Sequence, residues 1–147
     1  MKFFKFLLVA MILPSMAICQ QAKGSVNSSV DGPFIAVVDT MNLGEVTIDD
    51  LSDDYGRIQI SVKNTGTKPL ILNKVFGCCG TNIKEWPKAP ILPGKEGVIK
   101  VEFRTEIRPQ RISRTVTIES NAVNRKIAKV AILGVVVESK KSNEIVL

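Results

Sequence analysis

The chain has 147 residues, with 20 lysines and arginines, 14 aspartates and glutamates, and no histidine. This length fits one globular domain that buries a core without disulfide bonds. The lack of histidine excludes histidine-based catalytic triads and removes the commonest protein ligand for metals, so the composition argues against an enzyme.

Residues 1–19 have the three parts of a secretory signal peptide: a basic start, an apolar run and small residues before a cleavage point. The apolar run is shorter than the roughly 20 residues of a membrane-spanning helix, so we predict no transmembrane segment. We predict cleavage after Cys19 and export to the periplasm or cell envelope of a bacterium. A lipid anchor on Cys19 is less favoured, because Ile18 replaces the small residue that precedes a lipidated cysteine.

Residues 20–33 are small and polar and show no periodicity, which predicts a flexible tether. Beyond the tether, apolar and polar residues alternate with period two, as half-buried strands require. The clearest examples are 57–63, 99–104 and 115–119. Turn-forming residues separate these segments at 64–69, 93–97 and 120–124.

The last apolar segment, 127–137, is nearly continuous and rich in β-branched residues, which indicates a strand covered on both faces or bent at Gly134. A polar tail follows at 139–147. Residues 34–138 therefore predict an antiparallel immunoglobulin-like β-sandwich of about seven strands. We expect Trp86 to cap the segment before Pro87. The phase of the strands predicts a core made of Ile58, Ile60, Val62, Leu70, Leu72, Ile99, Val101, Phe103, Val116 and Ile118.

Cys78 and Cys79 are adjacent and have a glycine on each side. A disulfide between neighbours is strained, since adjacent Cα atoms lie about 3.8 Å apart and ordinary bridges prefer about 4.4–6.8 Å. Such a bond is easily reduced and would suit a redox pair. Two thiolates would also suit Cu(I), whereas a closed zinc site needs four ligands.

The favoured interpretation of the two cysteines is structural. One thiol packs inward as a small apolar group, and the other is exposed or pairs between chains. We therefore predict no cofactor and no metal, and keep Cys78 and Cys79 as the weaker candidates for a metal site.

Arg104, Arg108, Arg111 and Arg114 crowd one connection and the segment that follows it. Arginines in such a group bind the phosphate or carboxylate of an envelope glycan or of a partner protein, although a solvated loop is the simpler interpretation. The group lacks interleaved aromatic rings for base stacking, so we predict no nucleic-acid partner.

Several short motifs occur in a characteristic order and spacing. They are Asn42-Leu43-Gly44-Glu45-Val46, Val62-Lys63-Asn64-Thr65-Gly66-Thr67-Lys68-Pro69-Leu70, the cysteine turn, Trp86-Pro87, Ile91-Leu92-Pro93-Gly94-Lys95-Glu96-Gly97 and Ser120-Asn121. Over about Met41 to Glu138 this pattern resembles the bacterial family called domain of unknown function 1573. The resemblance implies an exported immunoglobulin-like domain, related in architecture to PapD-like chaperone and sperm-protein domains.

The family usually carries Cys-Gly-Cys where this chain has Cys78-Cys79-Gly80, so the second thiol is displaced by one position. In an extended turn, neighbouring side chains point in opposite directions, and the displaced pair would diverge.

The sequence as a whole predicts an exported immunoglobulin-like module rather than an enzyme. We expect it to bind a protein or another envelope component through its sheet edges and loops. The alternative is a thiol-based redox or Cu(I)-handling domain that uses Cys78 and Cys79.

Overall fold

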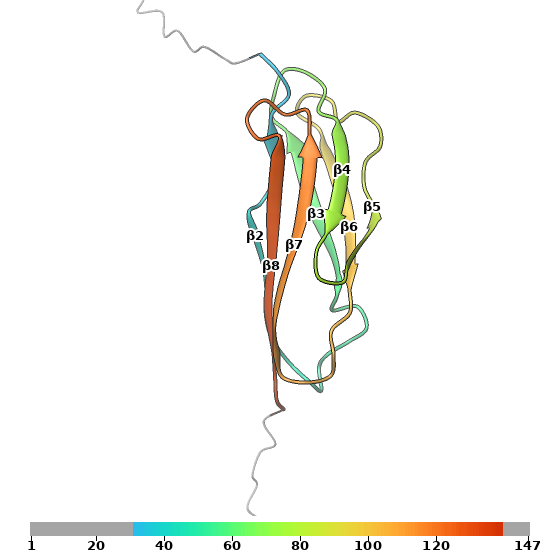
Figure 1. Cartoon of the computed structure of the whole chain (residues 1–147), viewed down its shortest axis with the longest axis vertical. Coiled ribbons are helices and arrows are strands. Elements are labelled where there is room, and N and C mark those ends of the chain that lie inside the picture. The colour runs from blue at the N-terminus through green and yellow to red at the C-terminus, as the bar shows by residue number, and fades with distance from the viewer. Residues whose placement is uncertain (1–30, 140–147) are drawn as a thin grey trace, which may run out of the picture.

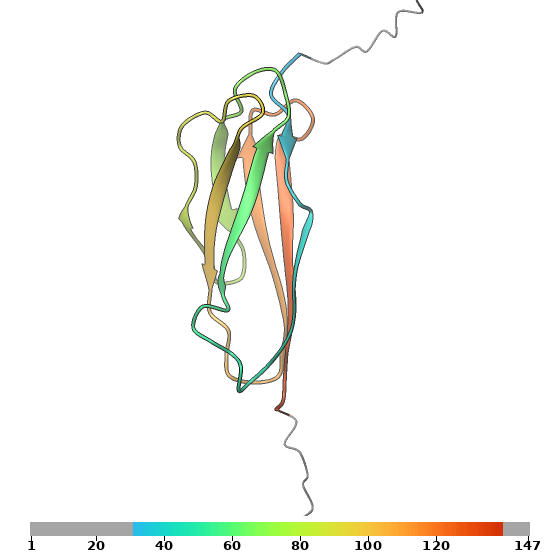
Figure 2. The ribbon, with the colours of Figure 1, turned by 180° about the vertical axis from the view of Figure 1, so that it is seen from behind.

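A computed structural model describes residues 31–139, which form a β-sandwich of eight strands and no helix (Figure 1). Sheet A has the order β1-β3-β6-β5 and contains β1 (Ile35–Ala36), β3 (Arg57–Asn64), β6 (Glu96–Phe103) and β5 (Thr81–Glu85). Sheet B has the order β2-β8-β7-β4 and contains β2 (Thr40–Thr47), β8 (Ile127–Val137), β7 (Gln110–Ser120) and β4 (Leu72–Gly77). Figure 2 shows the molecule from behind, with sheet A in front.

The predicted immunoglobulin-like sandwich is confirmed, with one departure from purely antiparallel pairing. The chain leaves sheet A after Ala36 and enters sheet B at Thr40, so one edge segment contributes to both sheets. It runs antiparallel to β3 as β1 and parallel to β8 as β2. This division of the first strand also explains why the structure has eight strands where the sequence predicted about seven.

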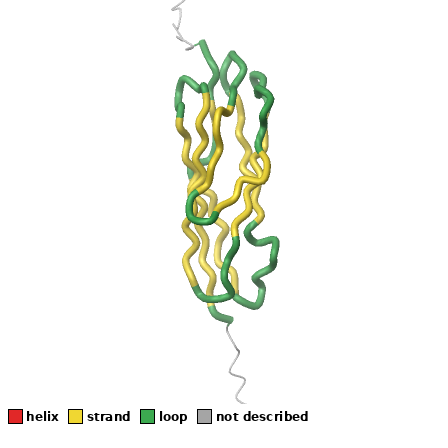
Figure 3. The backbone as a smooth tube through the Cα atoms, turned by 45° about the vertical axis from the view of Figure 1, so that its right-hand side comes forward, coloured by secondary structure: helices red, strands yellow, loops and turns green. Residues whose placement is uncertain are grey.

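The longer loops gather at the two ends of the sandwich, and the tube in Figure 3 also shows the short turn between β4 and β5 partway along it. Residues 65–71, 86–95 and 121–126 lie at the upper end in the view of Figure 1, together with the start of the described chain. Residues 48–56 and 104–109 lie at the lower end. No helix within 31–139 is long and apolar enough to cross a membrane.

The core lies between the sheets and follows the predicted phase of the strands. Of the predicted core residues, Ile58 is only half-buried, because it lies near the lower end of β3 where sheet A stops. Trp86 is also half-buried, beside the end of β5. The other predicted core residues are buried in the structure: Ile60, Val62, Leu70, Leu72, Ile99, Val101, Phe103, Val116 and Ile118.

Of the two alternatives predicted for residues 127–137, covering on both faces is wrong within the described chain. The burial of β8 alternates strictly, because its inner side faces the core and its outer side faces solvent. Leu133 and Val135 are 40% and 36% exposed on that outer side. Gly134 lies on the inner side, where an added Cβ would be 2.9 Å from the Tyr55 hydroxyl.

Asn64 ties the loops of the upper end together. Its fully buried side chain donates hydrogen bonds from Nδ2 to the carbonyls of Lys68 and Ile91, both at 2.8 Å, and accepts one from the Gly66 N–H at 2.9 Å. Gly66 is required here, since a Cβ would lie 2.2 Å from the carbonyl oxygen of Gly32. The predicted turn at 64–69 is therefore built around one buried amide.

The packed domain begins earlier than the predicted boundary at residue 34. Gly32 and Pro33 are buried, and their carbonyls accept hydrogen bonds from the N–H groups of Thr67 and Val123, both at 2.9 Å. The end of the predicted tether is thus held by two loops of the upper end. The predicted signal peptide, Cys19, the rest of the tether and residues 140–147 of the tail lie outside the described residues.

Candidate functional site

The two cysteines lie in a tight turn where the chain crosses from β4 in sheet B to β5 in sheet A. The Thr81 N–H donates to the Cys78 carbonyl at 3.1 Å, which closes a four-residue turn. The central residues Cys79 and Gly80 have φ values of 56° and 76°, as in a type I′ turn. Because the backbone is not extended here, the alternation of neighbouring side chains does not apply to this pair.

The glycines on either side of the pair have different roles. A Cβ at Gly77 would lie 2.6 Å from the Thr81 side chain, so only glycine permits this close approach. Gly80 has open space around it but occupies the left-handed region of φ. Within 31–139, Cys79 is the one non-glycine residue with positive φ, a conformation that costs an L-residue roughly 1–2 kcal/mol.

Both cysteines are exposed, so the expectation that one thiol packs inward is wrong, and within residues 31–139 neither is in a disulfide. The reason is the turn, which carries both residues outside the sandwich as the chain changes sheets. Cys78 is held against β7 because its N–H donates to the Thr115 carbonyl at 2.9 Å.

The two thiols interact with each other and have different surroundings. Hydrogen bonding from the Cys79 thiol is the main cause that lowers the pKa of Cys78, and hydrogen bonds from the backbone and hydroxyl of Thr115 add to it. The pKa of Cys79 is raised, mainly by Cys78, although nearby Arg114 acts in the opposite direction. The two thiols therefore titrate as a coupled pair.

Arg114 fastens the turn from inside the sandwich. It occupies the inward phase of β7, between buried Ile112 and Val116, and its Nη1 donates to the Cys79 carbonyl. The guanidinium carbon lies 6.0 Å from the centre of the Phe103 ring. Its Nε is buried without a hydrogen-bond partner within the described residues.

The four arginines predicted as an anion site lie in different surroundings. Arg104 and Arg108 are exposed in the loop at 104–109, where Arg108 pairs with Glu106. Arg111 is exposed on β7 and alternates with inward-facing Ile112. Only Arg114 reaches the cysteine turn, and no single anion site collects all four guanidinium groups.

Among the described strands, none pairs with the lower half of β7 on the side of the turn, which makes it a free sheet edge. Residues 110–119 of β7 pair continuously with β8, whereas β4 pairs only with residues from Val116 upward. The Thr115 carbonyl points toward Cys78, and backbone groups in a strand alternate in direction. The N–H and C=O groups of Arg111 and Ser113 therefore point to the open side.

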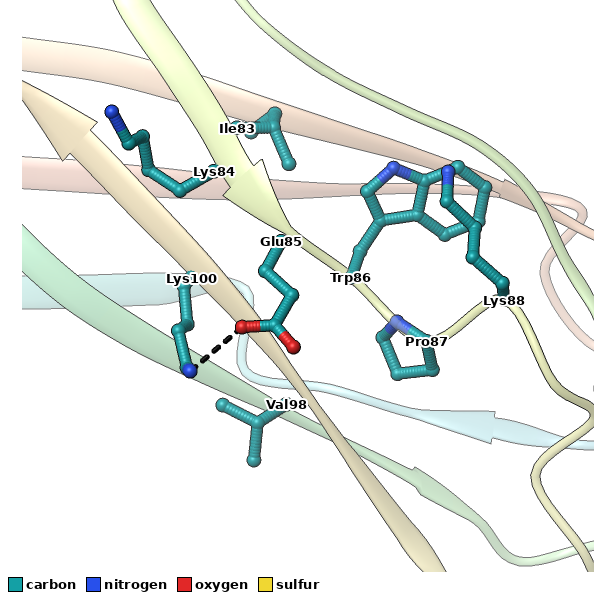
Figure 4. Close-up of a pocket in the computed structure, with 8 residues that line it drawn as sticks. All are labelled: Ile83, Lys84, Glu85, Trp86, Pro87, Lys88, Val98 and Lys100. Carbon is teal, nitrogen blue, oxygen red and sulfur yellow. Dashed lines mark ion pairs between the residues drawn. The ribbon is translucent and has the colours of Figure 1, made fainter.

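The hollow beside Trp86 has a volume of about 630 Å³ and lies where β5 meets the segment after it (Figure 4). Its lysines are already engaged. The Nζ of Lys100 is 2.7 Å from Glu85, and that of Lys88 is 3.1 Å from the centre of the Trp86 ring. Lys84 pairs with Glu102 at 3.0 Å, so each of the three lysines is held by a carboxylate or by the Trp86 ring, and the hollow carries no ligand assignment.

Two thiols are the only soft ligands at the turn, and within residues 31–139 no three cysteine or carboxylate side chains gather as a metal centre. The site offers a pair of exposed thiols, an arginine beneath them and an unpaired strand edge. This arrangement can exchange disulfides and can pair with an extended peptide.

The two four-stranded sheets define the chain as an immunoglobulin-like β-sandwich, a fold that it shares with a PapD-like domain. The ASH/PapD-like domain 7 of human CEP192 matches it at 9% identity with a TM-score of 0.50, over 86% of this chain and 100% of that domain. The chain belongs to the DUF1573 family of proteins of unknown function, whose family model matches residues 37–136. The resemblance seen in the sequence is therefore confirmed.

Other solved structures share this fold. A protein of unknown function from Porphyromonas gingivalis W83 matches at 13% identity with a TM-score of 0.58, over 77% of this chain and 51% of that one. The secreted serine protease VesC from Vibrio cholerae matches at 10% identity with a TM-score of 0.51, over 70% of this chain and 23% of the protease. The chain therefore spans about half the length of the Porphyromonas gingivalis protein and about a quarter of the length of the protease. No curated protein matches the chain.

Proposed function

We propose that this domain is an exported binding module that holds an extended, acidic segment of another polypeptide along the lower edge of β7. The observation that carries the proposal is the stretch from Gln110 to Arg114, which pairs with β8 on one side and with no strand of residues 31–139 on the other. An extended segment that pairs with a free edge gains main-chain hydrogen bonds without any change in the sheet.

The other edge strands carry features that discourage pairing. The register of β2 shifts between Asn42 and Glu45, that of β4 between Leu72 and Lys74, and that of β5 between Ile83 and Glu85. The β1 strand has only two residues. Bulges, short edges and charged side chains protect sheet edges against added strands. The lower half of β7 has regular pairing with β8 and no such bulge, so it is the edge best suited to a partner strand.

The charges near this edge favour an acidic partner. Within the described residues no ion pair engages Arg104 or Arg111, and both are exposed. Ile107, in the same loop as Arg104, is 78% exposed and could contact an apolar side chain of the partner. A strand in line with β4 would bring its backbone to Arg111 and Ser113 and its carboxylates to the arginines.

Alternating peptides test the binding proposal. A synthetic Val-Glu repeat of about ten residues serves as the probe, and a Val-Lys repeat of the same length is the charge control. We expect the acidic peptide alone to bind and to slow amide exchange at Arg111 and Ser113. Binding that protects β2 or β5 instead, or that does not distinguish the two peptides, would reject this edge.

Proline at position 113 supplies the matched variant. It removes an N–H that faces the open side and leaves the pairing with β8 intact. We expect Ser113→Pro to weaken peptide binding about tenfold, which corresponds to the loss of about one hydrogen bond. An unchanged urea midpoint would show that the effect is on binding and not on folding.

Export is a separate part of the proposal and rests on the signal-like residues 1–19. Intact mass of the protein isolated from its native host tests it. A chain that begins at Gln20 supports simple cleavage, and a chain with acylated Cys19 at its start supports a lipid anchor. An uncleaved chain in the cytoplasmic fraction would contradict export.

A thiol-based function is the second candidate, and the exposure of both cysteines favours it. This candidate function is either redox exchange or, less favoured, Cu(I) binding by the two thiolates. If the double variant Cys78→Ser/Cys79→Ser keeps the biological function of the protein, this candidate is rejected. Strand binding at β7 should survive the same double variant.

A further inference from the structure

We propose that the outer face of sheet B binds the same face of a second copy of this chain. The two copies are related by a two-fold axis that lies over Thr115 of β7 and Ala131 of β8. This dimer goes beyond peptide binding at the edge of β7, because it uses side chains that project from the sheet. Peptide pairing uses the backbone groups in the plane of the sheet.

The outer face of sheet B leaves apolar side chains in solvent, and it is turned toward the reader in Figure 1. Along β8 the residues that point outward include Ile127, Leu133 and Val135, and Ile127 is 56% exposed. Phe76 of β4 is 41% exposed on the same face. Covering these side chains is favourable, since it removes apolar surface from water.

The charges on β7 make this face complementary to itself. Arg111 and Glu119 occupy outward positions, and each lies four residues from Thr115. When β7 of a second copy packs antiparallel over this strand, with Thr115 over Thr115, each arginine meets the glutamate of the other copy. Neither side chain takes part in an ion pair within residues 31–139. The face therefore offers two equivalent ion pairs to a second copy of itself.

The apolar residues of β8 repeat this symmetry. Ala131 is the register partner of Thr115, and Ile127 and Val135 lie four residues to either side of it. The same rotation places Val135 on Ile127 of the second copy, beside the ion pair on β7. The side chain of Ala131 is small, so the two sheets can approach closely at the axis.

The other lysines of the face tolerate this packing. Lys129 lies over Leu133 of the second copy, where its aliphatic stem covers apolar surface while its ammonium group reaches water. Lys74 is the register partner of Glu119 on β4, and its Nζ is 5.0 Å from the centre of the Phe76 ring. Its charge is thus engaged by a ring of its own strand.

The size of the face predicts a weak dimer. A width of about three strands and a length of about nine residues correspond to roughly 450 Å² for each copy. The total of roughly 900 Å² is below that of a standard interface, so the dimer should form only at high protein concentration.

Sedimentation of the chain from Gln20 onward, the expected exported form, tests for the dimer. We expect self-association between about 1 μM and about 1 mM, the range in which weak complexes dissociate. Arg111→Glu and Glu119→Arg should each weaken it at least about tenfold, because each change brings like charges together at two places. Lys95→Glu, at an exposed lysine of the upper end, is the control and should change nothing. A wild-type chain that stays monomeric to about 1 mM would overturn the proposal and leave the face to a different partner.

A mixture of the two charge-reversed variants is the sharper measurement. In a heterodimer the acidic side chains of one variant meet the basic side chains of the other, so both ion pairs return. We expect an equimolar mixture of Arg111→Glu and Glu119→Arg to dimerise within about threefold of the wild type, and the double variant to do so by itself. Recovery in the mixture also shows that both variants are folded. A mixture that stays as dissociated as its components would overturn the pairing and the proposed face with it.

Glu119 also separates the two uses of β7. It lies on the part of β7 that β4 covers, above the free edge. Glu119→Arg should therefore weaken the dimer and leave binding of the acidic Val-Glu peptide within about twofold. Self-association that survives Glu119→Arg but is abolished by Ser113→Pro would mean that the copies pair edge to edge, and the face-to-face dimer would be rejected.

Discussion

The Arg114 side chain donates a hydrogen bond to the Cys79 carbonyl, across 35 residues of sequence and from one sheet to the connection between the two sheets. The contact places a cation inside one edge of the sandwich, next to Phe103 and beneath the exposed thiols. The turn therefore depends on β7 at two points, through Arg114 and through the Thr115 carbonyl.

Replacing Arg114 should loosen the turn. We expect Arg114→Met to lower the free energy of unfolding by about 1–2 kcal/mol, because a hydrogen bond to the Cys79 carbonyl is lost while the apolar stem is kept. Amide exchange at Thr81, whose N–H closes the turn, should become faster. Urea unfolding and exchange measurements check both effects. Arg111→Met is the control and should stay within about 0.5 kcal/mol.

The positive φ of Cys79 predicts a stabilising substitution. Cys79→Gly should be more stable than Cys79→Ser by about 1 kcal/mol, because glycine occupies the left-handed region without the steric cost that serine retains. Urea unfolding of the two variants measures the difference. Both lack the thiol, so the comparison isolates the backbone. Equal stabilities would mean that the turn relaxes in solution to a negative φ.

The alternating segments were enough to predict the sandwich and most of its core, because burial on one face imposes a period of two. The division of the first strand into β1 and β2 was not predictable, since its pairing depends on long-range contacts with β3 and β8. An arginine in a strand suggests an outward position, so Arg114 was not placed inside. Its phase with Ile112 and Val116 was the available signal.

The cysteine site was located in the sequence, but its geometry was not. The inference that neighbouring thiols diverge assumed an extended backbone, whereas Cys79 and Gly80 both have positive φ. The free edge of β7 could not be foreseen either. It arises because β4 ends at Gly77 and the chain crosses to sheet A, which leaves the lower half of β7 unpaired on that side.

Ionisation of the thiol pair should make stability depend on pH. Because the pKa of Cys78 is lowered in the folded state, the folded protein loses this proton at a lower pH than the unfolded protein does. Stability therefore rises with pH between that lowered value and the ordinary thiol value. The raised pKa of Cys79 has the opposite effect, and stability falls as the pH rises above the ordinary value.

We therefore expect a shallow stability maximum near the ordinary thiol pKa. Both groups are exposed, so solvent screening keeps the effect small. Urea midpoints from about pH 7 to about pH 10 check it. The maximum should vanish in Cys78→Ser/Cys79→Ser, and its survival in that variant would assign it to other groups.

The buried amide of Asn64 should be one of the most sensitive positions in the fold. We expect Asn64→Ala to lower the free energy of unfolding by about 2–4 kcal/mol, because three hydrogen bonds from a fully buried amide are lost and the loops that it joins lose their common partner. Asn42→Ala is a matched control, since the Asn42 amide accepts one exposed hydrogen bond from Gly44 and its loss should cost below about 1 kcal/mol. Thermal unfolding of both variants tests the contrast.

Gly134 and Tyr55 should be coupled through the close approach of the Tyr55 hydroxyl to the backbone of β8. Gly134→Ala would place a Cβ 2.9 Å from that hydroxyl, so we expect a loss of about 1–3 kcal/mol from overpacking. The hydroxyl is buried without a hydrogen-bond partner within the described residues, so Tyr55→Phe should be neutral or slightly stabilising. The double variant should recover part of the loss, because phenylalanine lacks the clashing atom. A double-mutant cycle by urea unfolding measures this coupling, and strictly additive effects would show that the alanine is accommodated by a movement of β8 instead.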